Sequence, residues 1–216
     1  DIAQWLTASG IAAFILKYRL GPRYHDPIEL EDAQRAIRTV RADAAQYNIS
    51  PDKVGMWGFS AGGNLTASAG TRFDSGNSAA TDPIDRQSSR PDFLILAYPV
   101  ITMTDPYVHK GSRTALLGPD PTQAAIEANS PELHVTPQTP PTFLYATTDD
   151  GTVPAINSIM FYTALFKAGV PAEIHLFQHG SHGSGLGGDN PELDVWPALL
   201  DKWMRERGYA ATPHVP

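Results

Sequence analysis

Residues 54–62 read Val-Gly-Met-Trp-Gly-Phe-Ser-Ala-Gly, and this stretch decides the fold class. The apolar run Val54–Trp57 predicts a buried strand, and a helix former follows Ser60 directly. Gly58 and Gly62 flank the serine at a distance of two residues, where we expect a side chain to collide with neighbouring backbone. The pattern indicates a strand, a sharp turn and a helix that present a serine hydroxyl at the edge of a sheet.

Strands and helices alternate along the rest of the chain. Apolar runs predict strands at residues 11–18, 54–59, 93–97, 142–147 and 172–177. Apolar residues at helical spacing predict helices at residues 1–9, 28–47, 61–72, 113–117, 121–128, 155–168 and 193–207. This order predicts an α/β fold with a mostly parallel sheet and helices on both faces. We expect a single domain over residues 1–216, with residues 102–140 as an insertion that covers the site.

The composition excludes several classes of function. The chain has 216 residues and a formal charge of −7, without a run of lysine or arginine, so we expect no nucleic-acid partner. It has no cysteine, which excludes disulfides, thiolate metal sites and cysteine nucleophiles. Because no apolar run reaches the length of a membrane span, we expect no membrane partner. The compartment, cytoplasmic or secreted, is left open.

Three loops that follow predicted strands carry the side chains of a nucleophilic triad. Ser60 follows the strand at 54–59, Asp149 and Asp150 follow the strand at 142–147, and His182 follows the last strand. In such a sheet these loops meet at the carboxyl ends of the strands. The serine hydroxyl would attack an acyl carbonyl, the imidazole would take and return its proton, and an aspartate would hold the imidazole in place.

The choice between the two aspartates rests on the residues that follow them. Val153 and Pro154 stand three and four residues after Asp150, and this spacing favours Asp150 as the partner of the histidine. Asp149 then shapes the turn, although it stays the alternative.

Two other interpretations of these residues remain open. His175, His179 and His182 form an H-x3-H-x2-H cluster, a candidate metal site that lacks the helical spacing of metalloprotease ligands, so we expect no metal. His182 could also be a surface loop residue, and Ser60 could stand in a glycine-rich turn without reactivity.

The chain resembles the α/β-hydrolase superfamily and, more narrowly, bacterial carboxylesterases of the acetyl-xylan-esterase-like or feruloyl-esterase-like kind. The motifs that carry the resemblance are residues 11–20, 58–63, 149–154 and 180–183. The resemblance implies that Ser60 is the nucleophile, His182 the base and Asp150 the residue that orients it, and that the Ala61 N–H is an oxyanion donor. It also implies hydrolysis of short-chain acyl esters, small or carbohydrate-linked, without a cofactor.

The chain departs from this family pattern in two places. Relatives often have His-Gly-Phe where this chain has His182-Gly183-Ser184. Relatives also carry earlier strands and a glycine-rich loop that gives a second oxyanion donor, so we expect an α/β-hydrolase fold that is N-terminally incomplete. A preceding segment or a second copy of the chain would complete the sheet. A peptidase or acyl-aminoacyl hydrolase of the same fold, and a catalytically silent binding protein, are the alternative functions.

Overall fold

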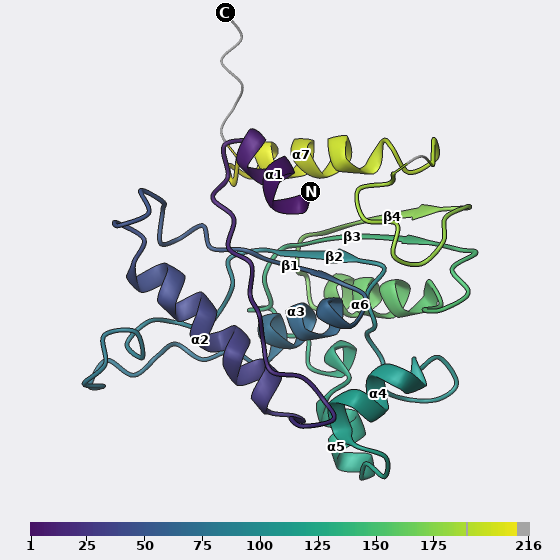
Figure 1. Cartoon of the computed structure of the whole chain (residues 1–216), viewed down its shortest axis with the longest axis horizontal. Coiled ribbons are helices and arrows are strands. Elements are labelled where there is room, and N and C mark those ends of the chain that lie inside the picture. Colours follow the sequence, from purple (N-terminus) through teal and green to yellow (C-terminus); the bar gives the residue numbers. More distant parts are fainter. Residues whose placement is uncertain (189, 211–216) are drawn as a thin grey trace, which may run out of the picture.

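Four parallel strands form the sheet of the computed structural model, which describes residues 1–188 and 190–210 (Figure 1). They are β1 (Met56–Phe59), β2 (Leu94–Ala97), β3 (Thr142–Thr147) and β4 (Ala172–Phe177). The strands lie in the order β1-β2-β3-β4, and each pairs in parallel with the next. The expected α/β class with a parallel sheet is confirmed.

Helices connect the strands and cover both faces of the sheet (Figure 1). They are α1 (Ile2–Ala8), α2 (Ile28–Ala42), α3 (Ala61–Thr71), α4 (Lys110–Leu117), α5 (Gln123–Ala128), the short 3-10 helix η1 (Pro131–Leu133), α6 (Ile156–Lys167) and α7 (Trp196–Glu206). None of these described helices has the length and apolarity that a membrane span needs.

The sheet face toward α7 and α1 holds a large aromatic cluster. Ile95 and Ala97 of β2 point to this face, while Leu94 and Leu96 point to the other, as the alternation along a strand requires. The cluster includes all four tryptophans of the chain, which are Trp5, Trp57, Trp196 and Trp203. Burial of both faces explains why the strands are continuous apolar runs.

The opposite face packs against α3 and α6. Ala67 of α3 and Phe161 of α6 are fully buried against Leu94 and Leu96 of β2. Behind α3 lies α2, whose Ala33 and other apolar residues form a smaller cluster with α3. The helix that follows Ser60 is therefore held between the sheet and a second helix.

The strand expected at residues 11–18 is absent from the structure, and that prediction was wrong. Residues 11–20 run as a coil between α1 and α2, at a steep angle to the strands in Figure 1. Ile15 is 87% exposed, and Phe14 and Leu20 are exposed as well. Leu16 and Tyr18 instead pack against the cluster between α2 and α3.

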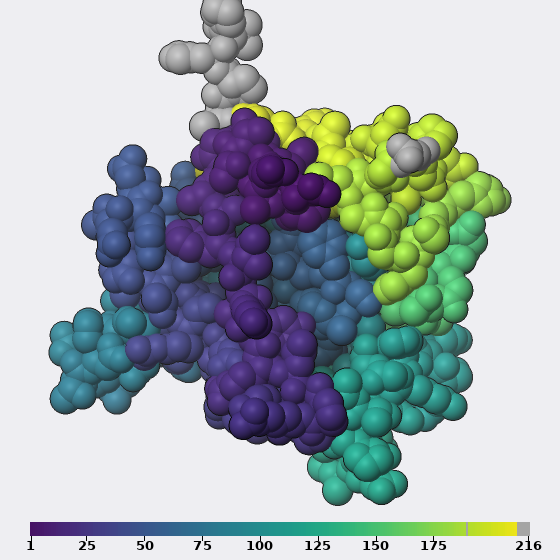
Figure 2. Space-filling view, in the orientation of Figure 1, coloured from purple at the N-terminus to yellow at the C-terminus, as the bar shows by residue number. Residues whose placement is uncertain are grey.

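The physical reason lies in the hydrogen-bonding partners of this segment. A strand needs a neighbour that accepts and donates along its length. β1 pairs with β2 on one side, and no strand among the described residues pairs with its other side. In residues 11–20 the Arg19 N–H donates to the Asp32 carboxylate rather than to another strand. Figure 2 shows the segment as a purple ridge beside a recess, with the blue of the β1–α3 region at its floor.

Strand β1 begins two residues later than predicted, and Asp92 binds Val54 just before it. The Val54 N–H donates to Asp92 Oδ2, and the Asp92 N–H donates to the Val54 carbonyl. The ladder with β2 starts only at Met56. Strands β3 and β4 have the predicted bounds.

Candidate active site

The turn at Ser60 joins β1 to α3 with a strained backbone. Ser60 has φ 52° and ψ −120°, a conformation that a residue with a Cβ rarely adopts and that costs about 1–3 kcal/mol. Two backbone hydrogen bonds hold it, from the Ser60 N–H to the Ala97 carbonyl (3.1 Å) and from the Val100 N–H to the Ser60 carbonyl (3.0 Å). The end of β2 therefore fixes the turn that presents the hydroxyl.

The glycines around Ser60 differ in how much room they have. A Cβ at Gly58 would lie 2.0 Å from the Gly62 carbonyl oxygen, and one at Gly63 would lie 2.5 Å from the Pro99 Cβ. A Cβ at Gly62 would meet no atom of the described residues within 4 Å. The expected collision therefore holds at Gly58 but not at Gly62, and Gly63 is the second crowded position.

Ser60, His182 and Asp150 come together in one hydrogen-bonded line. His182 Nε2 lies 2.7 Å from Ser60 Oγ, and His182 Nδ1 lies 2.7 Å from Asp150 Oδ2. The three residues follow β1, β4 and β3, whose carboxyl ends meet at this edge of the sheet. When the Nδ1 proton points to Asp150, Nε2 has a free lone pair for the Ser60 proton.

The carboxylate of Asp150 is almost completely buried and saturated with donors. Its side chain is 1% exposed. Oδ1 accepts from the N–H groups of Thr152 (2.8 Å) and Val153 (3.0 Å), while Oδ2 faces His182. The two backbone donors fix the orientation of the carboxylate, so Oδ2 stays directed at His182.

Asp149 forms a separate pair with a different histidine. Its Oδ2 lies 3.0 Å from His179 Nδ1, and its Oδ1 accepts from the Gly180 N–H at 2.8 Å. The hydrogen bond from His179 lowers the pKa of Asp149, and the bond to Asp149 raises the pKa of His179. This pair ties the loop after β3 to the loop after β4, three residues before His182.

Two tyrosines that the sequence did not single out hold the loop of His182. The Tyr98 ring packs edge-on against the His182 ring, with 5.0 Å between their centres. The Tyr98 hydroxyl accepts from the Gly185 N–H (3.1 Å), and the Tyr145 hydroxyl donates to the Gly185 carbonyl (2.8 Å). Burial raises the pKa of both hydroxyls, so they stay neutral around neutral pH. The position of Tyr98 directly after β2 was the available signal.

Ala61 begins α3, so its N–H has no acceptor inside the helix. The N–H adjoins Ser60 at the positive end of the helix dipole, a position that favours negative charge. It is therefore available to an oxygen that gains negative charge near Ser60.

The three clustered histidines face different carboxylates. His175 Nε2 lies 2.8 Å from Glu173 Oε1, whereas His179 faces Asp149 and His182 faces Asp150. In the described part of the chain, no group of three or more histidine or carboxylate residues is arranged to hold a metal ion.

Comparison with known proteins places this geometry in a family. Residues 1–165 match the BD-FAE family. The chain belongs to the BD-FAE family. The crystal structure of an acetyl ester-xyloside bifunctional hydrolase from Caldicellulosiruptor lactoaceticus superposes on this member with a TM-score of 0.95 and 45% sequence identity. The match covers 97% of this chain and 76% of that one. The expected α/β-hydrolase fold and the resemblance to acetyl-xylan-esterase-like carboxylesterases are confirmed.

Two curated relatives of this BD-FAE member are much longer. Endo-1,4-beta-xylanase B of Butyrivibrio fibrisolvens is 38% identical over 83% of this chain and 28% of its own length. The acetylxylan esterase of Xylanibacter ruminicola is 34% identical over 95% of this chain and 40% of its own length. The chain thus spans less than half the length of either relative.

Proposed function

We propose that this chain hydrolyses carboxylic esters with short acyl groups through an acyl-enzyme on Ser60. The observation that carries the proposal is the line from Ser60 Oγ through His182 to Asp150, with 2.7 Å at each step. Names of relatives add support, because they include an acetylxylan esterase and an acetyl ester-xyloside hydrolase. Acetyl esters of sugars are therefore the substrate class that we propose.

In the proposed mechanism, each group of the site has one task. Ser60 Oγ attacks the ester carbonyl while His182 Nε2 takes its proton, and buried Asp150 stabilises the imidazolium that forms. The Ala61 N–H donates to the carbonyl oxygen as it becomes negative. His182 then gives the proton to the leaving alcohol. In the second half of the reaction, water attacks the acyl-enzyme while His182 takes its proton, and His182 returns this proton to Ser60 Oγ as the acid leaves.

We also propose that residues 102–140 cover the site, as the sequence predicts. Support comes from the pocket next to Ala61, which is lined on one side by Met103 and by residues of α4. Buried hydrogen bonds hold this region to the core, among them that from the Thr102 N–H to Asn157 Oδ1 at 3.0 Å. Met103 and the α4 side chains that line the pocket would then contact the substrate.

A second oxyanion donor would come from a preceding segment or from a second copy of the chain. The open side of β1 supports this proposal, because no strand in residues 1–188 and 190–210 pairs with it. One N–H alone would leave the reaction slower, since one oxyanion donor is worth about 10²–10³ in kcat. Its contribution can be measured by adding the donor segment.

The test is hydrolysis of 4-nitrophenyl acetate by the chain and by its Ser60→Ala variant. We expect activity that falls at least about 10⁴-fold in the variant, because the nucleophile is gone. A fluorophosphonate probe should label the parent chain and not the variant. Activity that is equal in both would refute the proposal, and so would absence of both activity and labelling in folded protein.

A further inference from the structure

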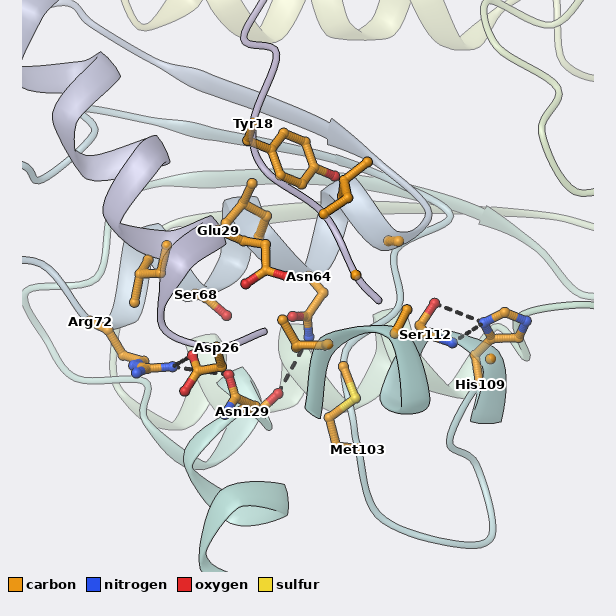
Figure 3. Close-up of a pocket in the computed structure, with 18 residues that line it drawn as sticks. Tyr18, Asp26, Glu29, Asn64, Ser68, Arg72, Met103, His109, Ser112 and Asn129 are labelled. Carbon is orange, nitrogen blue, oxygen red and sulfur yellow. Dashed lines mark hydrogen bonds and ion pairs between the residues drawn. The ribbon is translucent and has the colours of Figure 1, made fainter. Parts of the chain in front are cut away.

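A pocket of about 220 Å³ begins next to the nucleophile and runs along α3 (Figure 3). Ala61, Asn64, Leu65, Ser68 and Arg72 line it from one face of this helix. At a rise of about 1.5 Å per residue, the seven steps from Ala61 to Ser68 span about 10 Å. An acetyl group on Ser60 would not reach that far, so the deeper part is available to another portion of the substrate.

Most charged and polar side chains of the pocket already have partners within it. Arg72 binds Asp26 and the Asn129 side chain, each at 3.1 Å, and His109 Nδ1 lies 2.8 Å from Ser112 Oγ. These pairs leave the opposite wall, which carries Tyr18 and Glu29, as the place where a ligand would find free hydrogen-bonding groups.

Glu29 is the exception among the charged groups of the pocket. It is 4% exposed, and its Oε2 is buried without a hydrogen-bond partner among the described residues. In Figure 3 its carboxyl group lies between Tyr18, Ser68 and Asn64. Burial raises its pKa. A buried polar atom without a partner destabilises a protein, so such an atom in a pocket indicates a missing ligand group.

The size and lining of the pocket limit the ligand. A cavity of about 150 Å³ can hold benzene, so this pocket has room for a substituted six-membered ring. Apolar side chains of Leu30, Leu65 and Leu116 would contact the ring. A carboxyl group flanked by hydroxyl and amide groups pairs well with a neutral group that both donates and accepts, which is a hydroxyl.

We propose that this pocket binds a hydroxylated six-membered ring of the ester, and that Glu29 determines this specificity by a hydrogen bond to a ring hydroxyl. The proposal rests on the function proposed above. The ring could belong to the alcohol, as in an acetylated pyranoside, or to the acyl group, as in a hydroxyphenyl acid. Both present the same chemistry to Glu29.

The test compares ester pairs that differ in hydroxyl groups on the ring. The alcohol pair is methyl 2-O-acetyl-β-D-xylopyranoside and cyclohexyl acetate. The acyl pair is methyl 3-(4-hydroxyphenyl)propanoate and methyl 3-phenylpropanoate. For each pair we measure kcat/KM for the hydroxylated ester and divide it by kcat/KM for the ester without ring hydroxyls. For one pair, we expect Glu29→Leu to lower this ratio about 10- to 100-fold, because a hydrogen bond to a carboxyl group is lost. The pair that responds identifies the side of the ester.

Two further variants separate recognition from stability. Glu29→Gln keeps the shape and a hydrogen-bonding amide, so it should restore part of the ratio. Glu132 is a matched control because it also has a buried Oε2 without a partner among the described residues but does not line the pocket. Glu132→Gln should leave both ratios unchanged. Ratios that stay constant in Glu29→Leu for both pairs would overturn the proposal.

Failure of this proposal can be distinguished from failure of the proposed function. If 4-nitrophenyl acetate is hydrolysed through Ser60 while both ratios stay constant, only the role of Glu29 is wrong. If there is no such hydrolysis, calorimetry measures binding of methyl β-D-xylopyranoside and 3-(4-hydroxyphenyl)propanamide to the Ser60→Ala chain. The proposal is supported if Glu29→Leu weakens the binding of either probe at least about tenfold. It is refuted if Glu29→Leu leaves the binding of both probes unchanged, or if neither probe binds.

Discussion

Two Asp–His pairs lie side by side at the carboxyl end of the sheet, built from the same two loops. In the inner pair, the side chains of Asp150 and His182 are 1% and 18% exposed. In the outer pair, those of Asp149 and His179 are 49% and 55% exposed. The distances are similar, 2.7 Å and 3.0 Å, so geometry alone does not separate the pairs.

The two pairs differ in burial, and therefore in the strength of the interaction between aspartate and histidine. Charges in a low-dielectric interior interact far more strongly than charges that water screens. The inner pair also leads on to Ser60, whereas the outer pair connects to the backbone N–H of Gly180. Adjacent residues with the same chemistry thus serve the reaction and the attachment of the loops separately.

The largest expected effect comes from breaking the inner pair. Asp150→Asn keeps the shape but leaves His182 in the wrong tautomer, so we expect kcat for 4-nitrophenyl acetate to fall by about 10⁴-fold. The matched control is Asp149→Asn, which should change kcat by less than about threefold because the pair is exposed. A larger loss for Asp149→Asn than for Asp150→Asn would reverse the assignment.

We expect an intermediate effect from Tyr98→Phe, because Tyr98 contacts the loop that carries His182 of the inner pair. The variant keeps the ring that packs on His182 but removes the acceptor of the Gly185 N–H. Loss of one such hydrogen bond is worth about 1 kcal/mol, so we expect kcat/KM to fall by about three- to tenfold. Ser60 labelling by a fluorophosphonate should slow by the same factor. If neither rate changes, Tyr98 does not position His182.

The smallest expected effect is the pH dependence that the outer pair gives to stability. The pKa of His179 is raised above its usual 6.5, so its contribution is complete below pH 6.5 and is lost as pH rises through the raised value. The pKa of Asp149 is lowered from 3.8, so its contribution is present above pH 3.8 and is lost as pH falls through the lowered value. Both groups contribute fully between pH 3.8 and pH 6.5.

Thermal unfolding of the parent chain and Asp149→Asn measures this effect. The Tm difference should be largest near pH 5 and should be smaller near pH 9, where the His179 contribution has been lost. The control is Glu173→Gln, which breaks the partly buried pair with His175 outside the two loops. A Tm difference that is the same at both pH values would contradict the assignment of the effect to His179.

The strands were the most predictable part of the fold because their apolar runs are bounded by turn residues. Strands β3 and β4 have the predicted bounds. The same pattern failed at residues 11–18, since an apolar run does not reveal whether a neighbouring strand is there to pair with it. Secondary structure in a sheet depends on contacts that are distant in sequence.

The candidate site was predictable where single residues follow strands, and less so where loops meet. Ser60, Asp150 and His182 each follow a strand, and the structure brings these three together. The role of Tyr98 in holding Gly185 depends on a contact between residues that are 87 positions apart, and the only local sign of it is the place of Tyr98 directly after a strand. The orphan oxygen of Glu29 is likewise visible only once the pocket around it has formed.

The placement of all four tryptophans on one side of the sheet has a consequence for spectroscopy. Trp5, Trp57, Trp196 and Trp203 all report on the packing of α1 and α7 against the strands. The helices α2 and α3 and the pocket beside them contain no tryptophan. Intrinsic tryptophan fluorescence would therefore report loosening of the layer formed by α1 and α7. Opening of the layer formed by α2 and α3, which bears Glu29, would give no tryptophan signal and would have to be followed by a tyrosine probe or by hydrogen exchange.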